Sequence, residues 1–379
     1  MIGILCAAAL SASTQEAGTL TLDLSRPGPV VSKSLFGIFF EEINNAGEGG
    51  LYAELLHNRA LSPRGQTKLI GWTSQGADYT YSPTEKLNAA REGSISLKAE
   101  GKKAVLINSG FWGIGVKKGQ PLNLRLWLKG KGKAASRITA NGVPITNAAT
   151  APLSSTWREH QATLTPTKDG KGQLEITLDE GGELLLGYSS LMPVITWKNR
   201  PNGLRPDLAE RMAALKPGFL RFPGGCYVEG HNLGNRFEWR DTLKPIEQRK
   251  ATPVTFWGYP SSNGLGYHEY LQMAEDLNSD AMFVINCGMS HSEIQPMDKM
   301  GPYVQDALDA IEYAIGPTTS RMGAMRAARG RTKPFRLKYI EIGNENGYSW
   351  SFGGPAPYYE RFALIHKAIK AKYPQILTI

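Results

Sequence analysis

Apolar residues follow one another without alternation near the start of the chain, at 35–40 (Leu-Phe-Gly-Ile-Phe-Phe). An unbroken apolar run of this length predicts a β-strand that is buried on both faces, as in a parallel sheet. The apolar positions of 51–61 are spaced as on one face of a helix, so we expect a helix there. The strand and the helix together would make residues 19–69 a first β/α unit.

Residues 70–197 show short segments in which polar and apolar positions alternate, separated by turn residues roughly every 8–12 positions. This pattern is typical of an antiparallel β-sandwich inserted into the first unit. The clearest alternating segments are 94–98, 122–128 and 174–178. We expect the four tryptophans of this segment to pack in its core rather than to stack on sugars: Trp72, Trp112, Trp127 and Trp157.

Residues 198–379 alternate strand and helix patterns again. Further strands are expected at 219–223, 281–286, 337–343 and 376–379, with helices beginning at Pro206, across 267–277 and 302–328, and between Pro357 and Pro374. Repeated β/α units predict a parallel sheet, either open and doubly wound or closed as a (β/α)8 TIM barrel. No G-x-G-x-x-G follows a strand, and polar residues collect at the carboxyl ends of strands, which favours the barrel. With strand 35–40 the count is five of the eight that a barrel needs, so we expect a barrel truncated at its C-terminus.

Charge and targeting signals narrow the class of partner. The chain has 43 Lys and Arg against 34 Asp and Glu, a net charge of +9, but no arginine-rich arm or aromatic RNA-binding motif, so we expect no nucleic-acid partner. No apolar run of about 18 residues follows residue 15, so no membrane partner is expected either. Residues 1–13 resemble a secretory signal peptide, which predicts a secreted or periplasmic protein. The oligomeric state is left open.

Cysteine and histidine positions indicate no metal or cofactor. Of three cysteines, Cys226 and Cys287 lie outside the expected signal peptide, and two buried thiols are favoured over a disulfide. Two cysteines make no zinc motif, and the six histidines show no metal-ligand spacing.

The candidate chemistry lies just after the expected parallel strands. Asn344-Glu345 follows 337–343, and a partly buried carboxyl beside an amide suits a proton donor. Glu41-Glu42 follows 35–40, where carboxylates can hydrogen-bond sugar hydroxyls. Arg221 lies within 219–223; facing inward, it would need an anionic partner, because an unpaired buried charge is costly. The glycines that follow it would let a backbone approach a ligand closely.

These segments carry a resemblance. The stretches GIFFEEINNAGEGGLYAELLHNR, NGLRPDL, FLRFPGGCYVEG, RFEWRDTLKP and EIGNEN, in this order, resemble the α-L-arabinofuranosidases of glycoside hydrolase family 51. The intervening β segment, with LNLRLWLKG and ELLLGYSSLMP, is similar to the carbohydrate-binding-module-like insert of one branch of that family. The resemblance implies an exo-acting, retaining enzyme that releases terminal α-L-arabinofuranosyl residues from arabinoxylan, arabinan or related plant polysaccharides.

The resemblance also implies residue roles. Glu345 would be the catalytic acid/base, Asn344 would bind the sugar 2-hydroxyl, Glu41 would contact the arabinosyl ring, and Arg221 would support the nucleophile. Cys226 stands where some members carry a sugar-binding asparagine. The family's nucleophile is a glutamate at the end of strand seven, which would lie beyond this chain, so we expect these 379 residues to be inactive alone. Two alternatives stay open: another barrel glycosidase, such as a xylanase or endoglucanase, and a non-catalytic polysaccharide-binding protein.

Overall fold

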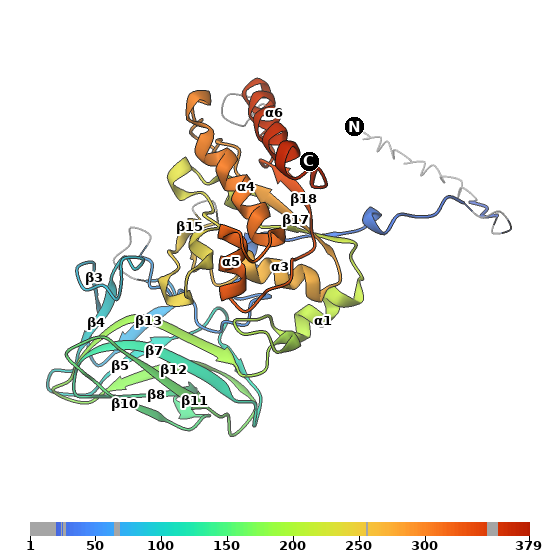
Figure 1. Cartoon of the computed structure of the whole chain (residues 1–379). Coiled ribbons are helices and arrows are strands. Elements are labelled where there is room, and N and C mark those ends of the chain that lie inside the picture. Colours follow the sequence, from blue (N-terminus) through green and yellow to red (C-terminus); the bar gives the residue numbers. More distant parts are fainter. Residues whose placement is uncertain (1–19, 24, 26–27, 64–68, 255–256, 347–354) are drawn as a thin grey trace, which may run out of the picture.

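The computed structural model describes residues 20–23, 25, 28–63, 69–254, 257–346 and 355–379 (Figure 1). The expected signal peptide lies outside the described residues. The chain forms a parallel sheet with helices packed against it and, at one end of the molecule, an antiparallel sandwich of two sheets (Figure 1). None of the described helices is both long and apolar enough to cross a membrane.

The parallel sheet has five strands in the order β1-β14-β17-β18-β19, and every neighbouring pair is parallel. Its strands are β1 (Ile38–Phe39), β14 (Phe219–Phe222), β17 (Asp280–Ile285), β18 (Leu337–Ile342) and β19 (Leu377–Thr378). The connections contain α1 (Pro206–Ala214), α3 (Tyr267–Asp276), α4 (Gly301–Ile315), α5 (Arg321–Ala328) and α6 (Pro355–Lys372). Consecutive strands are therefore neighbours joined through helices, which confirms the parallel β/α units predicted for this part of the chain.

The antiparallel strands predicted from the alternating pattern are present and form two sheets. One sheet contains β10 (Ala149–Pro152), β8 (Lys133–Ala140), β12 (Gly170–Leu178), β5 (Ala104–Asn108) and β2 (Trp72–Gln75), with β6 (Ile114–Val116) paired to β12 and β9 (Val143–Pro144) paired to β8. The other contains β11 (Arg158–Leu164), β7 (Leu122–Lys131), β13 (Glu183–Pro193), β4 (Ser94–Lys98) and β3 (Thr80–Ser82). Every second residue of β7 from Leu122 to Leu128 is buried, and these leucines share one core with Leu174, Ile176 and Leu178 of β12. Trp72 packs in this core as expected, but Trp112 is 62% exposed, so the prediction is wrong for that residue.

Short elements connect the larger ones. They are the helical turn α2 (Cys226–Glu229), the hairpin β15 (Thr252–Val254) and β16 (Tyr259–Ser261), and the 3-10 turns η1 (Lys33–Leu35), η2 (Ile43–Asn45), η3 (Trp197–Asn199), η4 (Leu233–Asn235), η5 (Asp241–Leu243), η6 (Ile246–Gln248) and η7 (Met297–Lys299).

The prediction that 35–40 is a strand buried on both faces is wrong. The strand covers Ile38–Phe39, and Phe36 and Phe39 are 73% and 56% exposed. The reason is its place in the sheet: β1 pairs with β14 on one side, and no described strand lies on its other side. Phe39 packs instead against the guanidinium of Arg221, 4.5 Å from its ring centroid.

The prediction of a helix across 51–61 is also wrong, because this segment contains turns and irregular backbone. Its backbone bonds go elsewhere: Ala53 donates to Gly203 O and Leu55 donates to Leu191 O. The polar members of the apparent amphipathic pattern, Glu54 and Arg59, are buried and paired with each other. Long-range bonds therefore override the local helical spacing.

Candidate active site

The carboxyl ends of β1, β14 and β18, together with the residues that follow them, form one edge of the parallel sheet, which we call the rim. Parallel strands point the same way, so their carboxyl ends share an edge. The structure brings the four residues singled out from the sequence to this rim: Glu41 follows β1, Arg221 lies within β14, and Asn344 and Glu345 follow β18. The rim is therefore the candidate active site.

Arg221 is held between two acceptors. It forms an ion pair with Glu341 of β18 and donates to Asn344 Oδ1 at 2.8 Å. Both side chains of the ion pair are mostly shielded from water, with exposed fractions of 16% and 17%. The anionic partner that an inward-facing arginine requires is therefore Glu341, which the sequence reasoning did not single out. The alternation of β18 held the signal, because Ile340 and Ile342 are buried on one face and Glu341 lies between them.

Asn344 is locked by a buried carboxylate. Glu229, 2% exposed, accepts from Asn344 Nδ2 at 3.1 Å and from Asn346 Nδ2 at 2.9 Å. With its NH₂ group fixed on Glu229, Asn344 must present Oδ1 to Arg221 and to the backbone N–H of Gly225, 3.2 Å away. Glu229 and Asn346 were not found from the sequence, since neither follows a strand directly.

Glu41 lies in a narrow space beside Gly225. A Cβ on Gly225 would stand 1.4 Å from Glu41 Oε2, and Gly225 has φ +66, so glycine is required here by both space and backbone conformation. The close approach inferred for this glycine is thus made to Glu41. Burial raises the pKa of Glu41; the positive charge of Arg221 opposes that shift, and the negative charge of Glu345 adds to it.

Glu345 is exposed at the rim, and its backbone has φ +53, in the left-handed region. The conformation is uncommon for a residue with a side chain, and such residues are often found at functional sites. Its negative charge contributes to the raised pKa of Glu41, so the two carboxylates lie near enough to repel each other.

Glu42 does not share the rim. It is 3% exposed and accepts from the backbone N–H of Glu48 at 2.9 Å. Burial, together with the nearby charge of Glu48, raises the pKa of Glu42 to about 8. Burial also raises the pKa of Glu48, against the opposing effects of the nearby Arg59 and of the hydrogen bond that Glu48 accepts from Ser262 N at 2.8 Å. Of the two acids after β1, Glu41 therefore lies at the rim, whereas Glu42 is buried away from it.

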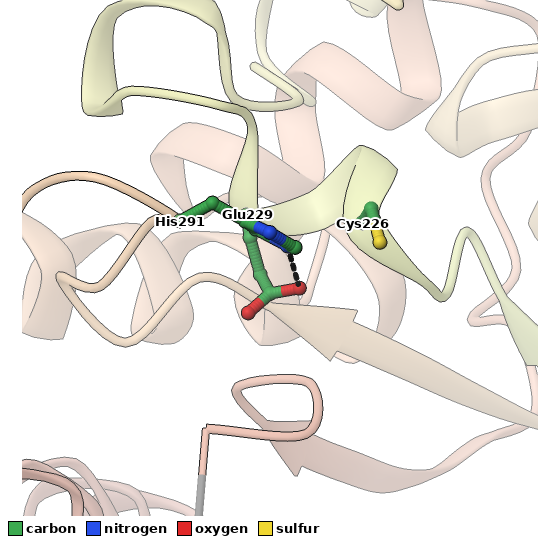
Figure 2. Close-up of side chains that lie close together, drawn as sticks. All are labelled: Cys226, Glu229 and His291. Atoms are coloured by element: carbon green, nitrogen blue, oxygen red, sulfur yellow. Dashed lines mark hydrogen bonds and ion pairs between the residues drawn. The ribbon is translucent and has the colours of Figure 1, made fainter. Parts of the chain in front are cut away.

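A second group of titratable side chains lies beside the rim, where Cys226, Glu229 and His291 come together (Figure 2). His291 Nε2 lies 3.1 Å from Glu229 Oε2. Hydrogen bonds to Cys226 and to Glu229 raise the pKa of His291 to about 10. Cys226 and Cys287 are both free thiols, as expected. Cys287 is buried as predicted, but Cys226 is only partly buried, so that part of the prediction is wrong for Cys226.

A parallel β/α sheet whose carboxyl edge carries acidic side chains, an arginine and an asparagine is typical of the barrel-type glycoside hydrolases. The family model of the α-L-arabinofuranosidase 1 domain matches residues 211–379. The chain is 34% identical over 95% of its length to an extracellular exo-α-L-arabinofuranosidase of Streptomyces chartreusis, and 35% identical over 96% of its length to α-L-arabinofuranosidase 1 of Arabidopsis thaliana. The arabinose-bound structure of MgGH51 α-L-arabinofuranosidase is 31% identical and covers 93% of the chain with a TM-score of 0.86. Over nearly its whole length the chain is therefore a relative of the α-L-arabinofuranosidases of glycoside hydrolase family 51.

The chain spans about half the length of these relatives. It covers 45% of the Streptomyces protein, 56% of the Arabidopsis protein and 60% of the MgGH51 chain.

Proposed function

We propose that this chain carries the acid/base side of an α-L-arabinofuranosidase active site, acting with retention on terminal arabinofuranosyl residues of plant polysaccharides such as arabinoxylan or arabinan. The observation that carries the proposal is the convergence of Glu345, Glu41 and the anchored pair Arg221–Asn344 at one rim. Similarity to this family and the arabinose bound in the similar solved structure support the sugar class.

Glu345 is proposed as the acid/base. In the first step its carboxyl gives a proton to the glycosidic oxygen as the bond to the anomeric carbon breaks. In the second step the resulting carboxylate takes a proton from the water that attacks the glycosyl-enzyme intermediate. Its exposed position at the rim would let both the leaving group and the water reach it.

Asn344 and Glu41 are proposed to hold the sugar. Asn344 Oδ1 already accepts from Arg221 and Gly225, whereas Nδ2 gives one of its two hydrogens to Glu229. The other Nδ2 hydrogen is the polar contact that the residue can still offer to a sugar 2-hydroxyl. Glu41, whose raised pKa reflects its partly dehydrated position, would accept from a ring hydroxyl.

We further propose that the nucleophile is not among these 379 residues. A retaining mechanism needs a second carboxylate about 5–5.5 Å from the acid/base. At the rim, Glu341 is engaged in its ion pair with Arg221, and Glu41 is assigned to sugar binding. Arg221, positioned by Glu341, would lie where it can support a nucleophile from a further barrel strand. The division into a first β/α unit (19–69), a sandwich (70–197) and barrel strands two to five (198–379) is part of this proposal.

The acid/base assignment is tested with Glu345→Ala in a longer protein that contains this chain, using aryl α-L-arabinofuranosides of graded leaving-group pKa. Loss of the proton donor should slow hydrolysis of poor leaving groups by about 10²–10⁴-fold and leave good leaving groups much less affected in the first step. Glu210→Ala, which removes an exposed carboxylate of α1, is the matched control and should change neither. An equal rate loss across all leaving groups would contradict the assignment.

The nucleophile proposal is tested with the 379-residue chain alone. We expect no hydrolysis of a nitrophenyl arabinofuranoside above the uncatalysed rate. Hydrolysis that is lost in Glu341→Gln or Glu41→Gln would show instead that a rim carboxylate of this chain is the nucleophile.

A second candidate role, polysaccharide binding by the sandwich, is favoured by the exposed ring of Trp112. It lines a cleft of about 620 Å³ together with Phe111 and the start of α1 at 205–207. A flat aromatic ring beside polar groups suits a sugar ring, which has one apolar face. This role is compatible with the enzyme, and a substrate panel that includes xylan and glucan would separate an arabinofuranosidase from a xylanase or endoglucanase. Secretion or export to the periplasm is proposed on the N-terminal sequence and on the extracellular Streptomyces relative.

A further inference from the structure

The group formed by Cys226, Glu229 and His291 has the geometry of a metal-binding site. One ligand atom from each residue, the thiol sulfur, a carboxylate oxygen and an imidazole nitrogen, lies within 4.8 Å of the other two. Cys226 and Glu229 are three residues apart on the turn α2, which puts them on one face of it, and His291 reaches them from the segment after β17 (Figure 2).

We propose that these three side chains bind one divalent transition-metal ion of the zinc type. Thiolate and imidazole are the ligands that Zn²⁺ prefers in proteins, and a carboxylate completes sets of three protein ligands. Ligand atoms around a tetrahedral Zn²⁺ lie 2.0–2.3 Å from the ion, so small side-chain rotations would close the separations seen here. Three protein ligands leave a fourth position for water.

The surroundings supply the outer hydrogen bonds that hold metal ligands in place. Glu229 is fixed by the amides of Asn344 and Asn346. The backbone N–H of His291 donates to Gly230 O at 3.2 Å, which ties its loop to the end of α2. Such partners orient ligands and raise metal affinity.

The site is separate from the proposed glycosidase chemistry but is linked to it. Glu229 Oε2, one of the atoms facing the ion, also accepts from Asn344 Nδ2. An ion bound to Glu229 would therefore change the hydrogen bond that orients Asn344. It would not itself contact the rim carboxylates. The expectation of no metal site rested on spacing along the chain, and His291 is 62 positions from Glu229, so no short motif could reveal the group.

The test is titration of the 379-residue chain with Co²⁺, a spectroscopic stand-in for Zn²⁺, followed by isothermal titration with Zn²⁺. We expect one ion per chain and a near-ultraviolet thiolate-to-cobalt charge-transfer band. Cys226→Ser should abolish the band, and it should weaken binding by more than the roughly 100-fold that loss of an outer partner can cost. His291→Gln, a separate variant, should weaken binding to a similar degree.

The control is the double variant Cys6→Ser/Cys287→Ser, which keeps Cys226 as the single cysteine and should retain the band. Circular dichroism of each variant establishes that it is folded. The absence of a band in the unmodified chain, or its survival in folded Cys226→Ser, would overturn the proposal.

Discussion

Glu54 pairs with Arg59 inside the irregular segment after β1 and also bonds this segment to the sandwich, so loss of its charge should be costly. Both side chains are buried, with exposed fractions of 0% and 1%, and Arg59 Nη1 lies 2.6 Å from Glu54 Oε2. The same carboxylate accepts from Ser190 Oγ at 2.6 Å and from the backbone N–H of Leu191 at 2.8 Å, both on β13. One carboxylate therefore satisfies donors from two separate parts of the chain.

Glu54→Gln is the sharpest perturbation, because it keeps the shape and removes the charge. The amide oxygen can still serve the backbone N–H groups, but the amide NH₂ then faces the donors of Arg59 and Ser190. Arg59 then loses the counter-charge to which it is hydrogen-bonded, and a buried pair that loses one member is destabilised by about 3–5 kcal/mol. The double variant Glu54→Gln/Arg59→Met removes the stranded charge and should recover about 0.5–3 kcal/mol of that loss.

The measurement is the free energy of unfolding from urea titrations followed by tryptophan fluorescence. Glu85→Gln is the matched control, because Glu85 pairs with Lys129 at 2.8 Å on the surface of the sandwich, where such a pair is worth about 0–1 kcal/mol. If Glu54→Gln costs no more than Glu85→Gln, or if the double variant is less stable than the single one, the reasoning about the buried charge is wrong.

Three further predictions concern single residues. Because the pKa of Glu42 is raised from 4.5 to about 8, its contribution to stability is complete below pH 4.5 and is lost as the pH rises through about 8; Glu42→Gln should flatten the thermal midpoint across that window in calorimetry. Burial raises the pKa of Cys287 to about 12, so peptide mapping after iodoacetamide should find Cys226 labelled in the native chain and Cys287 labelled only after denaturation. Trp112→Ala should weaken retention in arabinoxylan gels by about tenfold, whereas Val143→Ala, which truncates another exposed apolar side chain of the sandwich, should not.

The periodic elements of the second half of the chain were predictable because their signals are local. Strand β14 lies within 219–223 and strand β18 within 337–343, and helix α3 carries the buried stripe Tyr267, Tyr270, Leu271 and Ala274. In each case the apolar period, together with flanking proline or glycine, decides the element, and tertiary packing agrees with it.

Where the sequence misled, long-range contacts decide the outcome. The apolar spacing of 51–61 is that of a helix. The carboxylate of Glu54, however, accepts a hydrogen bond from Ser190 of β13, 136 positions away. The unbroken apolar run at 35–40 looks doubly buried, yet burial of a strand depends on neighbours that the run itself does not encode. The local sequence pattern predicts whether a segment is a helix or a strand. How far that element is buried depends on the neighbouring elements that pack against it.

The candidate site divides along the same line. Glu41, Arg221, Asn344 and Glu345 could be selected because each lies in or directly after a strand of a parallel sheet, where topology gathers side chains. Glu229 and His291 could not be selected, because they matter through contacts with residues that are distant in the sequence.

The residues that were missed set the geometry of those that were found. Glu341 fixes Arg221, and Glu229 fixes the amide of Asn344, so the position of the Arg221–Asn344 bond is determined twice, from β18 and from α2. Both supporting groups are carboxylates shielded from water, and each would be costly to keep without the partners it orients. The order of the rim therefore depends on two acids that have no part in the proposed bond-breaking step. If Glu229 also binds a metal ion, its negative charge is neutralised when the ion is bound. The ion would then act on the rim by weakening the hydrogen bond that orients Asn344.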